Sequence, residues 1–242
     1  MVVQGWDLLG FAIKDYYLQN DPEICLKVHT NCSGVETLPV EIFFRNDYSL
    51  PELERYALDL CQGRTLDVGA GAGCHSLILQ ERGLQVTAVD VARDAVEVME
   101  RRGLRHVLEA DIKEWEPEEQ FDTVLMLMNG IGLVGNLDGL KLFFKHAKRL
   151  LTPKAQLLLD STDFTLFPKF MKSWAASQSK LSRYFGEVEY RLEYKGQLSE
   201  AYSWLFLDQK TLEEYALEAG WFSQIIFEEE GQYLARLIRN EA

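Results

Sequence analysis

Residues 65–76 read TLDVGAGAGCHS, a short apolar segment followed by three alternating glycines, Gly69, Gly71 and Gly73. Another apolar run, residues 77–79, follows directly. This order predicts a strand, a glycine turn and a helix, because glycine adopts backbone angles closed to other residues and lets a ligand approach the main chain. The unpaired N–H groups at the start of such a helix point toward the turn. The segment therefore predicts a strand–turn–helix unit that binds a ligand.

A second apolar run, residues 86–89, ends at Asp90, which lies 17 residues after Gly73. In a βαβ unit this is the carboxyl end of the second strand, where an acidic side chain can accept hydrogen bonds from two ribose hydroxyls. Residues 65–90 therefore indicate a ligand that contains a nucleoside.

The glycine spacing separates two kinds of nucleoside cofactor. The dinucleotide fingerprint G-x-G-x-x-G requires a third glycine where this chain has Cys74 in one register and Ser76 in the other. Asp67, two residues before the first glycine, also suits a cationic ligand better than a polyphosphate. A dinucleotide is therefore disfavoured, and a nucleotide-dependent oxidoreductase stays an alternative interpretation.

The segment from Leu66 to Gly73, an acid followed by G-x-G-x-G, resembles the first motif of the class I S-adenosylmethionine-dependent methyltransferases, with a type 11/25-like methyltransferase domain. The resemblance covers residues 49–160 and 208–242. It implies an α/β, Rossmann-like fold with a seven-stranded, mostly parallel sheet, whose antiparallel last strand lies between strands five and six. An N-terminal cap and a hairpin in an insertion after strand five are expected beside this sheet.

The resemblance also implies a cofactor, S-adenosylmethionine, and the residues that bind it. Asp90 would bind the ribose, Asp111 the adenine amino group, and Ile112 would flank the ring. The full cofactor set comprises Asp67, Gly69, Ala70, Gly71, Gly73, Asp90, Val91, Asp111, Ile112, Met128 and Asn129, with Arg45 as a candidate partner of the methionyl carboxylate. A surface-exposed Arg45 is the alternative.

Methyl transfer mainly requires that donor and acceptor be aligned, and proximity and orientation supply much of the acceleration. A neutral oxygen or nitrogen acceptor must also lose a proton, so a base is needed nearby. Asp160 and Asp163 follow the fifth strand and are the candidate catalytic residues, although either could instead cap a turn. We expect no metal site, because the four histidines lack ligand spacing.

The chain is expected to divide near residue 48. Residues 1–48, rich in aromatic side chains, would form an N-terminal cap. Residues 49–242 would form the methyltransferase domain, in which 161–207 is an insertion that covers the substrate or, alternatively, only extends the sheet. Two pairs, Ser49 with Glu52 and Thr211 with Glu214, have the spacing of helix capping boxes.

Charge and composition narrow the class of protein. The 242 residues carry a net charge of −13, which argues against nucleic acid as a partner. The four cysteines include no C-x-x-C pair, and no apolar run approaches the length of a membrane span. We therefore expect a cytoplasmic protein with no membrane partner.

Together these features predict methyl transfer from S-adenosylmethionine to an oxygen or nitrogen atom of a small molecule. A protein of the same fold that binds the cofactor without turnover is the non-enzymatic alternative.

Overall fold

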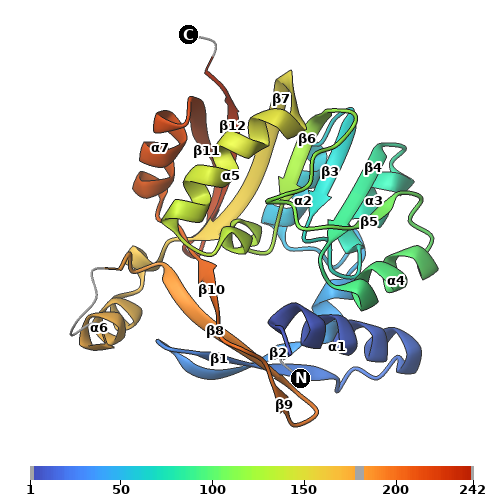
Figure 1. Cartoon of the computed structure of the whole chain (residues 1–242), viewed down its shortest axis with the longest axis vertical. Helices are drawn as coiled ribbons and strands as arrows, with labels where there is room; N and C mark the ends of the chain where they lie inside the picture. The colour runs from blue at the N-terminus through green and yellow to red at the C-terminus, as the bar shows by residue number, and fades with distance from the viewer. Residues whose placement is uncertain (1–2, 178–182, 241–242) are drawn as a thin grey trace.

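Two β-sheets organise the chain, shown in Figure 1 as a computed structural model that describes residues 3–177 and 183–240. The larger sheet has seven strands in the order β11-β12-β7-β6-β3-β4-β5. The smaller one is antiparallel, with the order β10-β8-β1-β2, and β9 pairs with β8. Helices pack on the larger sheet, so the fold is α/β and Rossmann-like, as the sequence predicts.

The strands of the larger sheet are β3 (Arg64–Val68), β4 (Gln85–Asp90), β5 (Val107–Glu109), β6 (Phe121–Met126), β7 (Leu151–Thr162), β11 (Trp221–Glu229) and β12 (Gln232–Arg239). Strands β3 to β7 run parallel to one another, whereas β12 is antiparallel to both β7 and β11. The turn between β11 and β12 is Glu230-Gly231, with φ of 48° and 86°, the left-handed pair that a tight hairpin needs. The antiparallel last strand predicted between strands five and six is confirmed.

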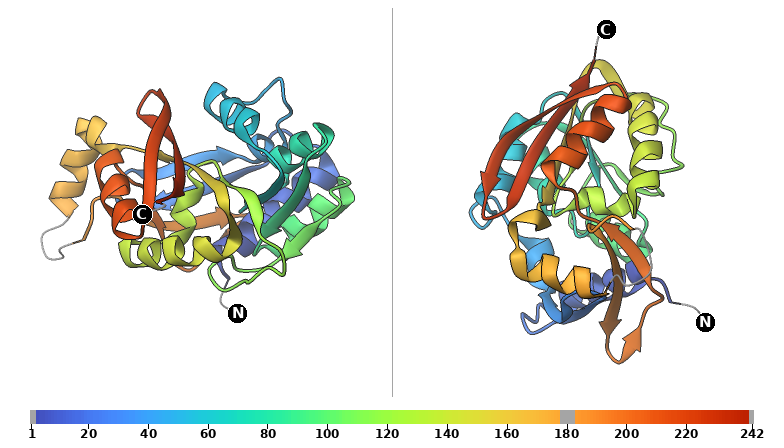
Figure 2. Two further views of the ribbon diagram at one scale, coloured as in Figure 1. Left: turned by 90° about the horizontal axis from the view of Figure 1, so that it is seen from above. Right: turned by 90° about the vertical axis from the view of Figure 1, so that its left-hand side faces the viewer.

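Helices cover both faces of this sheet (Figure 2). Helices α2 (Glu52–Leu60) and α3 (Cys74–Glu81) pack on a face that includes Leu125 and Leu158. Helices α5 (Leu137–Leu150) and α7 (Gln209–Glu218) pack on the opposite face, and α4 (Arg93–Arg101) packs on β4 and β5. Because side chains alternate along a strand, continuous apolar runs such as residues 157–159 fill both layers.

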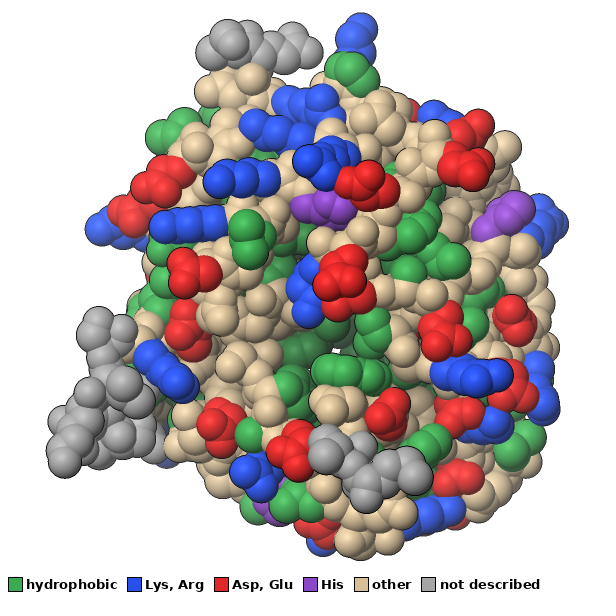
Figure 3. All heavy atoms as spheres, viewed as in Figure 1, with side chains coloured by type: hydrophobic (Ala, Val, Ile, Leu, Met, Phe, Trp, Pro, Cys, Tyr) green, Lys and Arg blue, Asp and Glu red, His purple; other side chains and the backbone are tan. Residues whose placement is uncertain are grey.

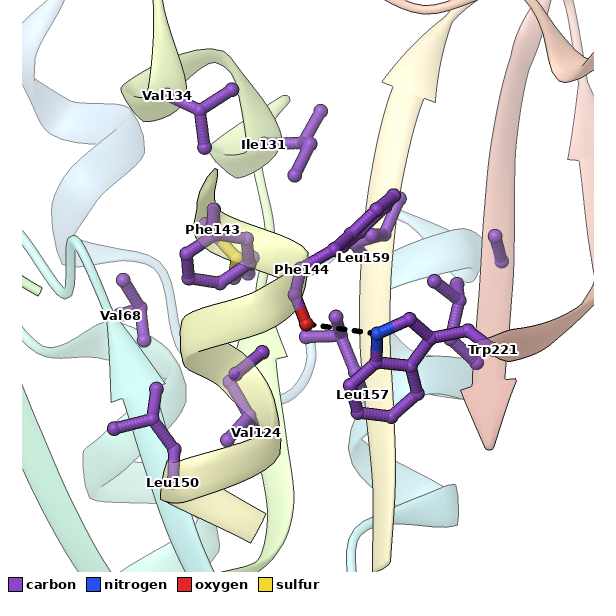
Figure 4. Packing of buried hydrophobic residues seen from close by; sticks show 14 of the residues in the cluster. Val68, Val124, Ile131, Val134, Phe143, Phe144, Leu150, Leu157, Leu159 and Trp221 are labelled. Atoms are coloured by element: carbon purple, nitrogen blue, oxygen red, sulfur yellow. Dashed lines mark hydrogen bonds between the residues drawn. The ribbon is translucent and has the colours of Figure 1, made fainter. Parts of the chain in front are cut away.

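The core beneath α5 is closed by Trp221, the first residue of β11. Its indole is fully buried and Nε1 donates a hydrogen bond of 2.9 Å to the carbonyl oxygen of Phe144 (Figure 4). This bond joins the edge strand of the sheet to a helix in the middle of its face.

The smaller sheet joins the N-terminal segment to the insertion after β7. Its strands are β1 (Cys25–Thr30), β2 (Gly34–Pro39), β8 (Glu187–Tyr194), β9 (Gln197–Leu198) and β10 (Tyr202–Leu205). Strand β1 pairs with β8, for example Val28 with Leu192, and the predicted hairpin turns at Lys195-Gly196. Helix α1 (Gly5–Gln19) contributes Leu8, Ala12 and Ile13 to an apolar cluster with this sheet.

The remaining elements are short. They are the 3-10 helices η1 (Val40–Phe44), η2 (Gly130–Val134) and η3 (Phe164–Leu166) and helix α6 (Pro168–Ser177). Within the described ranges, no helix combines the length and apolar character needed to cross a membrane.

Both predicted capping boxes are wrong. The N-cap of α2 is Pro51, and the Ser49 hydroxyl bonds instead to Asn46 in the preceding turn. In α7 the N-cap is Asp208, whose carboxylate accepts a hydrogen bond of 3.0 Å from the Thr211 N–H. Helix α7 therefore begins before Thr211, because the Asp208 carboxylate can serve as its N-cap and bond an N–H of the first turn.

Replacing Trp221 with Phe should lower the free energy of unfolding by ~1–3 kcal/mol, because a buried hydrogen bond is lost and a cavity is left. Denaturant unfolding of purified protein measures this change. Phe222→Leu, at the next position and 56% exposed, is the matched control and should shift stability by less than about 0.5 kcal/mol. Equal effects of the two substitutions would contradict this account of the core.

Candidate active site

The glycine turn lies at the carboxyl end of β3, the edge at which parallel α/β sheets bind ligands. Gly69, Gly71 and Gly73 have φ of 70°, 58° and 78°, a region that disfavours side chains. Helix α3 begins at Cys74 directly after the third glycine. The predicted strand–turn–helix unit is confirmed.

Asp90, the last residue of β4, ties this turn to the next loop. Its Oδ2 accepts a hydrogen bond of 2.9 Å from the Gly71 N–H, and its Oδ1 accepts one of 2.8 Å from the Ala92 N–H. Burial raises the pKa of Asp90, while these N–H groups oppose the shift. Each oxygen keeps capacity for a second donor.

Asp67 lies beneath the turn and is 2% exposed. It accepts a hydrogen bond of 2.6 Å from the Ser76 hydroxyl in the first turn of α3. Burial raises its pKa, and the nearby His75 and Ser76 partly offset this. The carboxylate therefore anchors the helix start to β3.

Three charged side chains form a buried network beside the turn, which we call the Arg45–Glu54–His75 network. Nη2 of Arg45 lies 2.7 Å from both Glu54 carboxylate oxygens, and Nε2 of His75 lies 2.6 Å from Oε2 of Glu54. Arg45 is not the exposed surface arginine of the alternative interpretation, since its side chain is only 17% exposed. Glu54 and His75 were not among the predicted site residues.

The loop after β6 is strained. Met128 and Asn129 have φ of 63° and 56°, and consecutive left-handed residues other than glycine cost free energy that functional sites often store. Asp160 of β7 holds this loop by accepting a hydrogen bond of 2.8 Å from the Asn129 N–H. Thr162 also donates to the Asn129 side chain at 2.8 Å.

Asp160 is a buried carboxyl group with a raised pKa. Burial raises its pKa to about 7, although the N–H groups of Asn129 and Gly130 act in the opposite direction. A base with this pKa exists in both protonation states near neutral pH.

Asp163 and Asp111 occupy turns at the same edge. Asp163 caps η3 and accepts hydrogen bonds from the N–H (2.9 Å) and hydroxyl (2.5 Å) of Thr165. Asp111 is half-buried and accepts a hydrogen bond of 2.9 Å from the Lys113 N–H.

Among the other predicted site residues, Ala70 and Ile112 are buried, whereas Val91, Met128 and Asn129 are half-buried.

A hollow lined by hydrophobic side chains lies between the two sheets (Figure 3). Two apolar side chains border the glycine turn, because a Cβ on Gly69 would lie 2.8 Å from Leu133 and one on Gly71 would lie 3.2 Å from Phe43. Trp204 of β10 packs directly on Gly132 of η2. The smaller sheet therefore lies against the loop that follows β6.

Two surface cavities lie away from this edge. One of about 350 Å³ is lined by Arg64, Gln85 and Phe121, at the amino ends of their strands. The other, of about 400 Å³, lies between α1 and the β8–β9 hairpin. Neither includes a predicted site residue. Among residues 3–177 and 183–240, no group of three or more His, Cys, Asp or Glu residues is placed to hold a metal ion.

The fold and this edge define a nucleoside-binding α/β protein, and comparisons with known proteins identify its family. A family model described as "Methyltransferase domain" matches residues 65–154. The structure is similar to that of a SAM-dependent methyltransferase from Bacteroides fragilis in complex with S-adenosyl-L-homocysteine. The two share 36% sequence identity with a TM-score of 0.86, over 99% of this chain and 98% of the other. The chain belongs to the S-adenosylmethionine-dependent methyltransferases, whose cofactor is S-adenosylmethionine.

Two curated relatives match shorter stretches. A cypemycin N-terminal methyltransferase from Streptomyces sp is 33% identical over 105 residues, which are 42% of this chain and 43% of the relative. A ubiquinone biosynthesis O-methyltransferase from Xanthomonas oryzae pv. oryzae is 30% identical over 115 residues, 45% of this chain and 46% of the relative. The matches thus span less than half of the length of these relatives.

The residues present fit the cofactor of this family. The left-handed glycines carry no side chain, so a ligand can approach the main chain of the turn closely, and Asp90 keeps acceptor capacity at the end of β4. In addition, the buried Nε of Arg45 has no hydrogen-bond partner among the described residues.

Ser76→Ala should lower the free energy of unfolding by ~1–3 kcal/mol, since Asp67 would lose its hydroxyl donor in a buried setting. Denaturant unfolding at neutral pH measures this loss. Unchanged stability would show that the start of α3 does not depend on this hydrogen bond.

Proposed function

We propose that this protein transfers the methyl group of S-adenosylmethionine to an oxygen or nitrogen atom of a small molecule. The observation that carries the proposal is the meeting, at one sheet edge, of the glycine turn, the Asp90 carboxylate and a buried base, Asp160. The sulfonium cofactor supplies an already activated methyl group. The protein's task is then to align the acceptor, exclude water and accept a proton.

The cofactor contacts in this proposal follow the edge of the sheet. Asp90 would accept hydrogen bonds from the ribose hydroxyls with its remaining lone pairs, beside Val91. Asp111 and Ile112 would hold the adenine. The methionine moiety would lie against the glycine turn, which comprises Gly69, Ala70, Gly71 and Gly73, with Asp67 beneath the turn. Met128 and Asn129 would contact it from the neighbouring loop. Arg45 would bind its carboxylate.

The acceptor would occupy the hollow between the two sheets, covered by those parts of residues 1–48 and 161–207 that the structure describes. Three aromatic side chains of the smaller sheet, Tyr190, Tyr202 and Trp204, lie with ring centroids 6.0–6.4 Å apart and face this side. Burial raises the pKa values of Tyr190 and Tyr202 above their usual range, so both hydroxyls stay protonated donors. These features support a partly apolar acceptor, and the net charge of −13 disfavours a nucleic acid.

Asp160 would act as the general base. Its carboxyl group lies at the end of β7 next to the strained Met128–Asn129 loop, and its pKa of about 7 suits proton abstraction near neutral pH. Asp163 is the second candidate, although its Oδ1 already caps η3.

The direct test is incubation of purified protein with S-adenosylmethionine and a panel of hydroxyl- and amine-bearing metabolites. Formation of S-adenosylhomocysteine together with a methylated product, detected by mass spectrometry, is the expected result. Cofactor binding without turnover on any acceptor would favour a non-catalytic binding protein.

Asp90→Ala should weaken binding of S-adenosylhomocysteine by ~1.5–3 kcal/mol, because charge-assisted hydrogen bonds to the ribose are lost. Calorimetric titration measures the dissociation constant. Asp94→Ala, four residues further on, removes a carboxylate that pairs with Lys14 and should leave affinity unchanged. An Asp90→Ala protein with normal affinity would remove Asp90 from the site.

The pH dependence of kcat/KM should show a rising limb with a midpoint near pH 7, since only ionised Asp160 accepts a proton. Asp160→Asn should abolish this limb and lower kcat by ~10²–10⁴-fold. Asp163→Asn, which can still cap η3, should retain the limb. Loss of the limb in Asp163→Asn alone would reassign the base.

A further inference from the structure

The Arg45–Glu54–His75 network joins three separate segments of the chain through one carboxylate. Arg45 follows η1, Glu54 belongs to α2, and His75 is the second residue of α3. Glu54 is 6% exposed and His75 is 5% exposed. Removing charged groups from water is costly unless they pair well, and the proposed cofactor contacts leave Glu54 and His75 without a role.

The network lies beside the glycine turn. His75 is two residues after Gly73, and Phe43, two residues before Arg45, packs against Gly71. The guanidinium of Arg45 is therefore held near the glycine turn, against which the methionine moiety of the cofactor would lie.

Arg45 keeps donor capacity after pairing with Glu54. Only its Nη2 atom bonds to Glu54, and its buried Nε has no hydrogen-bond partner among the described residues. A buried N–H without an acceptor is unfavourable, so the site favours a ligand that brings an acceptor. A carboxylate matches best, because guanidinium donors bind it with charge-assisted hydrogen bonds.

The charges of the network point to the same ligand group. Burial opposes ionisation of Glu54, but the hydrogen bond and charge of His75 and the charge of Arg45 lower its pKa. The pKa of His75 is raised well above its usual value: burial alone would lower it, but the adjacent Cys74, Glu54 and Asp67 outweigh this effect. Two cations and one anion leave a net charge of +1, which one ligand carboxylate would balance.

We propose that Glu54 and His75 are positioning residues that hold the Arg45 guanidinium for the carboxylate of the cofactor's methionine moiety. This inference rests on the proposed cofactor site. It explains why a buried glutamate bridges a residue of the N-terminal segment and the helix that follows the glycine turn.

The experiment compares two ligands that differ in the methionine moiety. S-adenosylhomocysteine carries the amino acid carboxylate, whereas 5′-methylthioadenosine is a thioether of the same nucleoside without it. Glu54→Gln should raise the dissociation constant of S-adenosylhomocysteine by about tenfold or more and change that of 5′-methylthioadenosine by less than about twofold. Glu52→Gln, an exposed position at the start of α2, is the matched control and should change neither.

Arg45→Gln should show the same selectivity for loss of S-adenosylhomocysteine binding, and Glu54→Gln should cause no further loss in the Arg45→Gln background. If Glu54→Gln does not fold, Arg45→Gln and His75→Gln carry the comparison. Parallel weakening of both ligands, or no weakening of either, would overturn the positioning role while leaving the cofactor site intact. A wild-type protein that binds neither ligand would overturn the cofactor site as well.

Discussion

The hydrogen bond from the Gly71 N–H to the Asp90 carboxylate is the contact on which the candidate site depends. It fixes a left-handed glycine in the turn after β3 to the end of the neighbouring parallel strand. The Ala92 N–H, in the loop after β4, donates a second hydrogen bond to the same carboxylate. The two loops therefore keep one geometry, with Asp90 as their shared acceptor. The backbone already orients the carboxylate that a ribose would contact there. Binding would therefore cost little conformational entropy.

Further along the same edge of the sheet, Asp160 also fixes a loop by accepting a backbone hydrogen bond. This carboxylate holds the strained loop after β6 by accepting the Asn129 N–H, as Asp90 holds the glycine turn. Burial raises the pKa of both groups. One edge thus carries two buried carboxylates that organise loops through backbone N–H groups, and the proposed chemistry uses what acceptor capacity remains.

Local patterns made the centre of the fold predictable from sequence. The run Leu66 to Gly73 and the position of Asp90 are separated by one helix, so a single βαβ unit fixes their relation. The position of antiparallel β12 between β7 and β11 followed from the family resemblance. The helix starts failed where an alternative local hydrogen bond competed, as Ser49 with Asn46 shows.

Long-range contacts were beyond the reach of local pattern. The pairing of Val28 with Leu192 builds one sheet from segments far apart in the chain. The hydrophobic periodicity of a strand does not indicate which other strand it pairs with. Likewise, Glu54 and His75 read as an ordinary helix residue and a helix-start residue until folding places both against Arg45. A glutamate on the otherwise apolar face of α2, next to Leu53, was the one available signal.

Calorimetric titration of the purified protein with S-adenosylhomocysteine, with NAD and NADP in parallel, tests the central claim most directly. The account predicts micromolar binding of the thioether and none of either dinucleotide, because the glycine turn and Asp90 suit an adenosyl nucleoside without a pyrophosphate. Dinucleotide binding, or absence of thioether binding, would contradict it.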